Sequence, residues 1–240
     1  QTGIATEVVR LGAGATVTNV IYVTKDGSDN NTGLKLGDAK SSIAGAVAIS
    51  TTGSIIRVSA GSYVENNPIK LPSQVSIVGD SLREVSITPQ NAGSDLFHVS
   101  PGNYLSELSF TGSMSAGSAI VAFDPEKPRY STQSPYLRNC TNFIRNSIGM
   151  KIDGNAVFGP FKSMVTDSFT QYNPNGIGVS ITNGGYAQIV SLFSINTDVG
   201  VFAGSGGQCD ITNSNSSFGN FGLVTDGASP RKNSGVIVTG

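Results

Sequence analysis

The segment CDITNSNSSFGNFGLV, Cys209–Val224, decides the fold of this 240-residue chain. It holds two short apolar stretches separated by a run of Asn, Ser and Thr, and it has no helical period. Asn and Ser favour turns because their side chains hydrogen-bond to the nearby backbone. The segment therefore predicts two short strands joined by polar turns.

Matching blocks precede this segment at a fixed spacing. Gly178, Gly200 and Gly222 lie at the centres of GIGVSI, DVGVFA and NFGLVT, and the interval from each to the next is the same. An earlier block, SIGMKI, places Gly149 at a longer interval before Gly178, which fits an insertion. A fixed period of this size is typical of a solenoid, in which each unit stacks on the one before it. The chain is therefore predicted to be an all-β solenoid with coils of about 22 residues.

The front of the chain differs from these repeats. DAKSSIAGAVAIS, residues 38–50, has apolar residues at helical spacing after an Asp, which predicts a helix. An open solenoid end exposes unpaired strand edges and core side chains. We expect the helix to cover that end as a cap.

The series IYVTKDGSDNNTG, then a helix, then SIIRVSAGSYVENNPIKLPSQVSIVGD resembles the start of pectin-lyase-like right-handed parallel β-helices. The resemblance implies an N-terminal linker or the end of a preceding region at 1–20, a capping strand and helix at 21–60, and β-helix coils at 61–240. It is specific for fold and not for function, because this fold carries lyases, hydrolases and viral fibres alike. The positions that carry it are Val58, Gly61, Tyr63, Glu65, Ile69, Leu71, Pro72, Val75, Ile77 and Gly79.

The later part of the chain, from SPYLRNC to NFGLVTDG, resembles virion structural proteins of tailed phages, especially T4-like marine cyanophages. This resemblance implies a non-enzymatic tail fibre, appendage or decoration module located in the virion. Its partners would be other virion proteins, a host surface glycan, and further copies of itself, for instance in a trimer. A polysaccharide lyase or hydrolase of the tailspike type and a bacterial surface adhesin are the alternatives.

Composition narrows the range of partners and cofactors. The formal net charge is −1 and there is no basic run, so neither nucleic acid nor an anionic membrane is an expected partner. No apolar run approaches the roughly 20 residues of a membrane helix. Cys140 and Cys209 fall in coils far apart and are expected to be free thiols. No cofactor is expected.

The carboxylates are the main test of an enzymatic function, because a glycosidase needs two of them close together. Aligning the later coils places Asp153 and Asp226 in one column but about three coils apart, and it gives Asp167 no acidic neighbour. Asp124 and Glu126 lie together, but in DPEKPRY, where a solvated loop is expected. The sequence therefore predicts a protein that is not an enzyme.

A histidine and three tyrosines are candidates for weaker roles. The single histidine, His98, is expected on a strand face rather than as a catalytic base. Tyr130, Tyr136 and Tyr172 lie in or beside longer loops, and tyrosine rings can stack on sugars. We predict that these tyrosines contact a glycan, with ordinary surface packing as the alternative.

Two further groups complete the predictions. DGSDNNTG resembles a calcium loop but lacks its final acid, so Asp26 and Asp29 are weak metal candidates and a structural turn is favoured. Strand alternation predicts that one column of glycines faces outward as an interface, and glycines with positive φ are the alternative. This column consists of Gly149, Gly178, Gly200 and Gly222.

Overall fold

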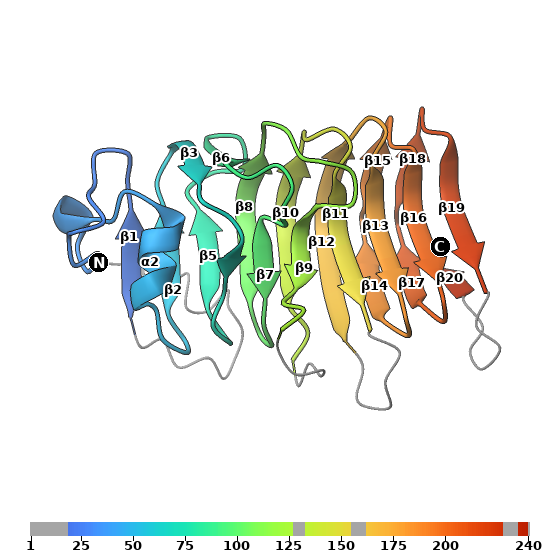
Figure 1. The fold of residues 1–240 in the computed structure, drawn as a ribbon, viewed down its shortest axis with the longest axis horizontal. Coiled ribbons are helices and arrows are strands. Elements are labelled where there is room, and N and C mark those ends of the chain that lie inside the picture. The colour runs from blue at the N-terminus through green and yellow to red at the C-terminus, as the bar shows by residue number, and fades with distance from the viewer. Residues whose placement is uncertain (1–18, 127–132, 155–161, 228–234, 240) are drawn as a thin grey trace.

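The structure is a computed structural model that describes residues 19–126, 133–154 and 162–227, together with the backbone of 235–239. The described strands pair in parallel and wind into a right-handed parallel β-helix, which confirms the predicted fold class (Figure 1). Coils follow one another along the long axis from β1 to β19, with the first and last elements at opposite ends.

The described strands form two sheets. The first sheet follows the order β1 (Val20–Val23), β2 (Ile55–Val58), β5 (Ser76–Gly79), β8 (Tyr104–Phe110), β10 (Tyr136–Asn142), β12 (Ser163–Tyr172), β14 (Tyr186–Val190), β17 (Gln208–Thr212) and β20 (Gly235–Thr239). Its side branches are β3 (Gly61–Glu65), β6 (Val85–Pro89), β15 (Phe193–Ile195) and β18 (Asn215–Ser217). The second sheet contains β4 (Ile69–Lys70), β7 (Phe97–Val99), β9 (Ala119–Phe123), β11 (Ile148–Asp153), β13 (Ile177–Thr182), β16 (Val199–Gly204) and β19 (Phe221–Asp226).

The segment Cys209–Val224 forms most of one such coil. Its strand β17 ends at a corner where Asn213 has a φ of 49°, β18 follows, and Phe218 with a φ of 59° leads into β19. Asn tolerates the left-handed region better than most residues because its short polar side chain bonds locally. The same corner recurs in successive coils at Glu107, Asn139, Ser168 and Ser191.

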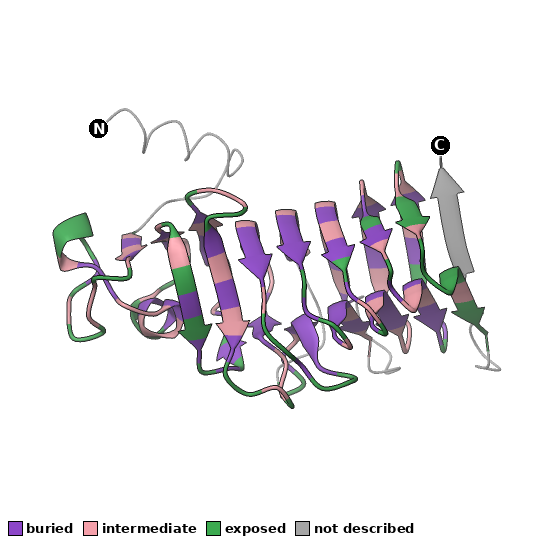
Figure 2. Cartoon of the chain, turned by 90° about the horizontal axis from the view of Figure 1, so that it is seen from above, coloured by how far each residue is buried: buried purple, intermediate pink, exposed green. Residues whose placement is uncertain are grey.

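The constant spacing of the late coils is visible directly in the register. Ile177 pairs with Val199, and Val199 pairs with Phe221. Inside the coils, Val179 stacks on Val201, and both side chains belong to one continuous core. Figure 2 shows that the strands of the middle coils are mostly buried, whereas β19 is largely exposed. Each fully buried Val or Ile contributes about 1.5–3 kcal/mol, so the stacked apolar columns stabilise the solenoid.

The predicted helix is present but shorter than the sequence pattern indicated. It is α2 (Ile43–Ile49), preceded by the short 3-10 helix η1 (Leu36–Asp38). It starts after Ser42, whose Oγ accepts a 2.9 Å hydrogen bond from the Gly45 amide, so the predicted start at residue 38 is too early. The helix contacts β1, β2, β3 and β4. Its role in covering the end of the solenoid stays a prediction.

Two smaller findings concern membrane spans and cysteines. In the part of the chain that the structure describes, no helix is long and apolar enough to cross a membrane.

Cys140 and Cys209 are both buried and free, as predicted. Burial raises the pKa of each thiol to about 12, so neither is a reactive thiolate near neutral pH.

Most of the predicted glycine column is buried in the coils and does not form an exposed stripe. Gly149, Gly178 and Gly200 are buried, and Gly222 is exposed. A Cβ at Gly178 would clash with the Gly200 carbonyl, and one at Gly200 would lie 2.6 Å from the Gly222 carbonyl oxygen. None of the four has a positive φ. The predicted outward orientation is therefore wrong for the three buried glycines, where the neighbouring coil or an inward side chain leaves no room for a Cβ.

Candidate functional site

Ionisable side chains gather on the outer face of the second sheet around His98. Register places Lys70 beside His98 on neighbouring strands, and Lys151 lies two strands further along the same row. Phe97 and Val99, on either side of His98 in the chain, point into the core, so alternation turns this row outward. We name the His98 cluster for the residues that meet here: Lys70, Asp95, His98, Asp124, Glu126 and Lys151.

His98 lies between two carboxylates. Its Nε2 is 3.3 Å from Oδ2 of Asp95, and its Nδ1 is 3.9 Å from Oδ1 of Asp124. The side chains of His98 and Asp124 are only 9% and 3% exposed. Nδ1 of His98 and Oδ2 of Asp124 have no hydrogen-bond partner among the described residues. Buried polar atoms are nearly always paired, so an unpaired set of this kind points to a functional site or to an ordered water.

The two lysines occupy the more open sides of the cluster. Nζ of Lys70 lies 2.5 Å from Oε2 of Glu126 and 3.8 Å from Oδ2 of Asp124. Nζ of Lys151 lies 3.3 Å from Oδ1 of Asp95. The hydrogen bond to Glu126 raises the pKa of Lys70 above its usual range, so Lys70 is charged at neutral pH.

Asp95 joins the histidine to one of the lysines. Burial acts to raise its pKa, but hydrogen bonds from His98, the Ala119 amide and Lys151 outweigh burial, and the pKa lies below its usual value. The carboxylate is thus held ionised beside the imidazole. Such a carboxylate fixes the orientation of a histidine and leaves its other nitrogen free to exchange a proton.

The His98 cluster corrects two predictions made from the sequence. Asp124, expected in a solvated loop, is buried. Carboxylates do gather, since Asp95 and Asp124 lie on the two sides of one imidazole. His98 itself lies on a strand face, as expected, but within this charged group. The alignment of the later coils missed the cluster because most of its members come from earlier coils of unequal length.

A second feature is a hollow of about 610 Å³ on the first sheet. The rings of Tyr104 and Tyr136 stack beside it, with centroids 5.8 Å apart and planes 10° apart. Because β8 and β10 belong to the first sheet, this hollow and the His98 cluster lie on different sheets. We call it the Tyr104 hollow, and its lining residues are Ile55, Val78, Gly79, Asp80, Tyr104, Ser106, Glu107, Arg138, Asn139 and Ser168.

The structure does not bring the predicted tyrosines together. Tyr136 stacks on Tyr104, and its Oη lies 3.5 Å from Oδ2 of Asp167. Tyr172 is 46% exposed at the end of β12. Tyr130 lies outside the described residues. A glycan-binding role for these tyrosines stays a prediction.

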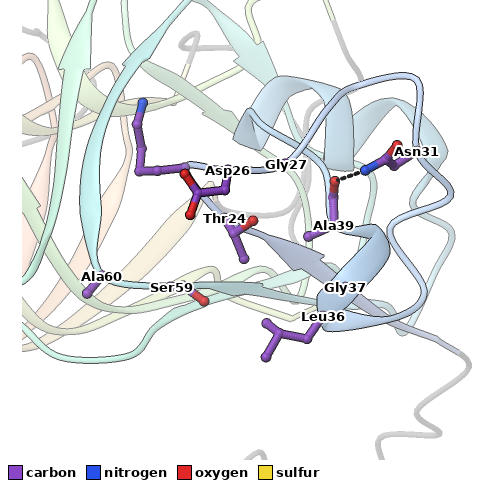
Figure 3. A pocket seen from close by; sticks show the side chains of 10 residues that line it. Thr24, Asp26, Gly27, Asn31, Leu36, Gly37, Ala39, Ser59 and Ala60 are labelled. Carbon is purple, nitrogen blue, oxygen red and sulfur yellow. Dashed lines mark hydrogen bonds between the residues drawn. The ribbon is translucent and has the colours of Figure 1, made fainter.

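The aspartates of the DGSDNNTG loop have different surroundings. Asp29 accepts hydrogen bonds from the Ser41 and Ser42 amides and from the Ser42 hydroxyl, so it holds the start of α2. Asp26 borders a separate hollow of about 480 Å³, together with Thr24 and other residues of the same region (Figure 3). Within the described ranges, no group of three His, Cys, Asp or Glu side chains is arranged to hold a metal ion.

No family model and no curated protein matches the sequence. The fold resembles solved polysaccharide lyases. Pectate lyase Pel9A is 18% identical with a TM-score of 0.54, and the match covers 84% of this chain and 54% of that one. A rhamnogalacturonan lyase is 14% identical (TM-score 0.45; 82% and 67% covered), and the PL6 family alginate lyase AlyGC is 10% identical (TM-score 0.45; 92% and 40% covered). This chain thus spans about half the length of pectate lyase Pel9A.

These comparisons bear out the predicted right-handed parallel β-helix, and at this level of identity they show the fold alone. They lend no support to the predicted phage origin. The prediction that the chain is not an enzyme is contradicted by the likeness of its fold to pectate lyase Pel9A. That prediction also rested on the absence of carboxylates close to one another. The structure places Asp95 and Asp124 on the two sides of His98, so this reason no longer holds.

Proposed function

We propose that this chain cleaves an acidic polysaccharide by elimination, with the His98 cluster as its acid–base centre. One observation carries the proposal. Nε2 of His98 contacts Asp95, whereas its Nδ1 has no hydrogen-bond partner among the described residues, and two lysines lie on the same outer row of the sheet. The likeness of the fold to pectate lyase Pel9A supports the choice of substrate class.

Elimination beside a uronate carboxylate needs two things from a protein. A base must remove the proton on the ring carbon that bears the carboxylate, and positive charge must stabilise the electron density that builds up there. The C=C bond then forms as the glycosidic oxygen leaves the adjacent carbon with the bonding electron pair and takes up a proton from water. In this chain we assign the proton acceptor to Nδ1 of His98, which is buried beside Asp124 and must be uncovered as the substrate binds, and the positive charge to Lys70 and Lys151.

The charges of the cluster allow a substrate carboxylate to enter. Glu126 is 75% exposed, so its side chain can turn into solvent and release Lys70 at little cost. Lys70 then pairs with the substrate, while Asp95 and Asp124 stay beside His98. An anionic sugar thus replaces an anionic side chain, and the local charge balance is kept.

The test is incubation of the chain with polygalacturonate, rhamnogalacturonan and alginate, with ultraviolet detection of unsaturated sugar ends. Unsaturated products are expected from at least one polymer, and their loss in His98→Gln assigns the activity to the cluster. A folded chain that releases no fragments from any of the three polymers would sink the proposal. Saturated reducing ends would indicate hydrolysis and would also overturn it.

The earlier prediction of a virion setting is separate from this chemistry. A depolymerase of this kind is compatible with a virion location and with virion partners. Both stay predictions.

A further inference from the structure

The Tyr104 hollow has a rigid aromatic surface with polar groups around it. Tyr136 stacks on Tyr104 from the next coil, and the two residues are direct register partners. A hydrogen bond to Tyr104 is also the main reason that the pKa of Arg138 is raised. The Tyr104 ring is therefore held in place before any ligand binds. Fixed aromatic rings suit sugars, because the apolar face of a pyranose packs against them with little ordering cost.

The carboxylates around the hollow are oriented by neighbouring residues. Nδ2 of Asn139 donates a 2.8 Å hydrogen bond to Oε2 of Glu107. Asp80 accepts hydrogen bonds from Arg57 at 3.2 Å and from the Ala60 amide at 3.3 Å. Glu107 and Asn139 are both corner residues with positive φ, so the recurring bend of the coil positions them. The result is a set of fixed hydrogen-bond acceptors beside an aromatic ring.

The balance of charge decides which sugars fit. Asp80 is paired with Arg57, and Asp167 lies 3.9 Å from Nε of Arg138. Glu107 forms no ion pair with the described residues and is bonded to a neutral amide. A further carboxylate placed here would be repelled, whereas sugar hydroxyls can donate to Glu107.

We propose that the Tyr104 hollow binds neutral pyranose units, with Tyr104 against the ring face and Glu107 accepting from hydroxyl groups. Its volume, about 610 Å³, falls in the usual range for small-ligand sites, roughly 300–1,000 Å³. The hollow lies on the first sheet and the His98 cluster on the second, so it is separate from the proposed centre of cleavage. Its use in anchoring a mixed polysaccharide rests on the proposed function, but the binding itself does not.

Calorimetric titration tests the binding with four probes: cellopentaose, maltopentaose, trigalacturonate and a mannuronate trimer. A neutral probe is expected to bind, and Tyr104→Ala and Glu107→Gln should each weaken that binding about tenfold or more, since an aromatic contact or a charged acceptor is lost. Phe193→Ala removes an exposed aromatic ring in β15, outside the hollow, and should leave the affinity unchanged.

Three outcomes overturn the inference. They are no binding of either neutral probe, binding that survives both substitutions in folded protein, and tighter binding of a uronate probe that Tyr104→Ala abolishes. The last would show that the hollow is a site for acidic sugars. Failure of the proposed cleavage is measured separately, as missing turnover of acidic polymers by the unmodified chain, so the two proposals can fail independently.

Discussion

The carboxylate of Glu65, at the end of β3, accepts a 2.6 Å hydrogen bond from the backbone amide of Ile43 at the start of α2. It accepts a second bond of 3.0 Å from the Ala44 amide, and Glu65 is only 1% exposed. The first turn of a helix has amides without partners inside the helix. A side chain of the solenoid bonds to two of them here, so α2 is tied to the coils by a buried carboxyl group.

Replacing Glu65 by Ala should therefore destabilise the fold strongly. Two amides would lose their partner, at about 1–3 kcal/mol each when buried, so a loss of about 2–6 kcal/mol is expected in urea unfolding. Glu84→Ala, which removes an exposed glutamate, is the control. A loss no larger than that of the control would mean that α2 does not depend on this contact.

The same carboxyl group predicts a dependence of stability on pH. Burial outweighs the two amide bonds and raises the pKa of Glu65 above its ordinary value of 4.5. The folded state then holds the proton more tightly than the unfolded state, so this contribution to stability is present below pH 4.5 and is lost as pH rises through the folded pKa. The stability of the unmodified chain relative to Glu65→Gln should fall over that range. A difference that does not change with pH would contradict this assignment.

Asp29, at the start of the same helix, should behave in the opposite way. Burial acts to raise its pKa, but the bonds from Ser42 and Ser41 outweigh burial and hold the pKa below its ordinary value of 3.8. Its contribution to stability is therefore present above pH 3.8 and is lost as pH falls through the folded pKa. Asp29→Asn should remove this loss in unfolding measurements at acidic pH. An equal loss in the variant would exclude Asp29 as its origin.

The buried glycines give a prediction about packing. Gly200→Ala would place a methyl group 2.6 Å from the Gly222 carbonyl oxygen, so a loss of about 1–3 kcal/mol is expected in unfolding. Gly37→Ala is the matched control, because its added Cβ would meet nothing within 4 Å. Equal stability of the two variants would mean that neighbouring coils move apart easily at Gly200.

The coils were predictable from the sequence and the cluster was not, and spacing explains the difference. The late glycines, from Gly178 to Gly222, recur at one constant interval, so their register is visible. The row from Lys70 through His98 and Ala122 to Lys151 advances by unequal steps, because the segments between these strands differ in length. Unequal segments hide a shared column from any fixed period.

The prediction that the glycines face outward, which assumed regular strand alternation, was wrong because of the local backbone geometry. Gly178 and Val179 are both buried, although alternation would place them on opposite faces. The paired residues pass from Ile177 to Val179 and omit Gly178, which marks an irregular step in the strand. Without a side chain, glycine lets the backbone turn two successive residues inward. This local geometry cannot be predicted from composition or period.

The proposed roles of His98 and Lys151 predict how substitutions in the His98 cluster affect cleavage. His98→Gln removes the proposed proton acceptor and should lower kcat about 10²–10⁴-fold on the polymer that the chain cleaves. Lys151→Ala removes positive charge beside the substrate and should lower kcat/KM. Lys35→Ala removes an exposed lysine outside the cluster and should change neither parameter in steady-state assays. Equal effects of the two lysine variants would exclude Lys151 from the site.

Asp95→Asn separates a positioning role of Asp95 from a purely structural one. Oδ1 of Asp95 accepts from the Ala119 amide and from Lys151, and Oδ2 contacts Nε2 of His98, so in Asp95→Asn the amide NH2 takes the place of Oδ2 and faces Nε2 as a donor. If His98 is the base, a protonated imidazole loses a stabilising anion in this variant. The variant should lower kcat for this reason and because the NH2 favours the tautomer that carries its proton on Nδ1, the proposed acceptor. If the variant is less stable but keeps the kcat and the pH profile of the unmodified chain, Asp95 has only a structural role.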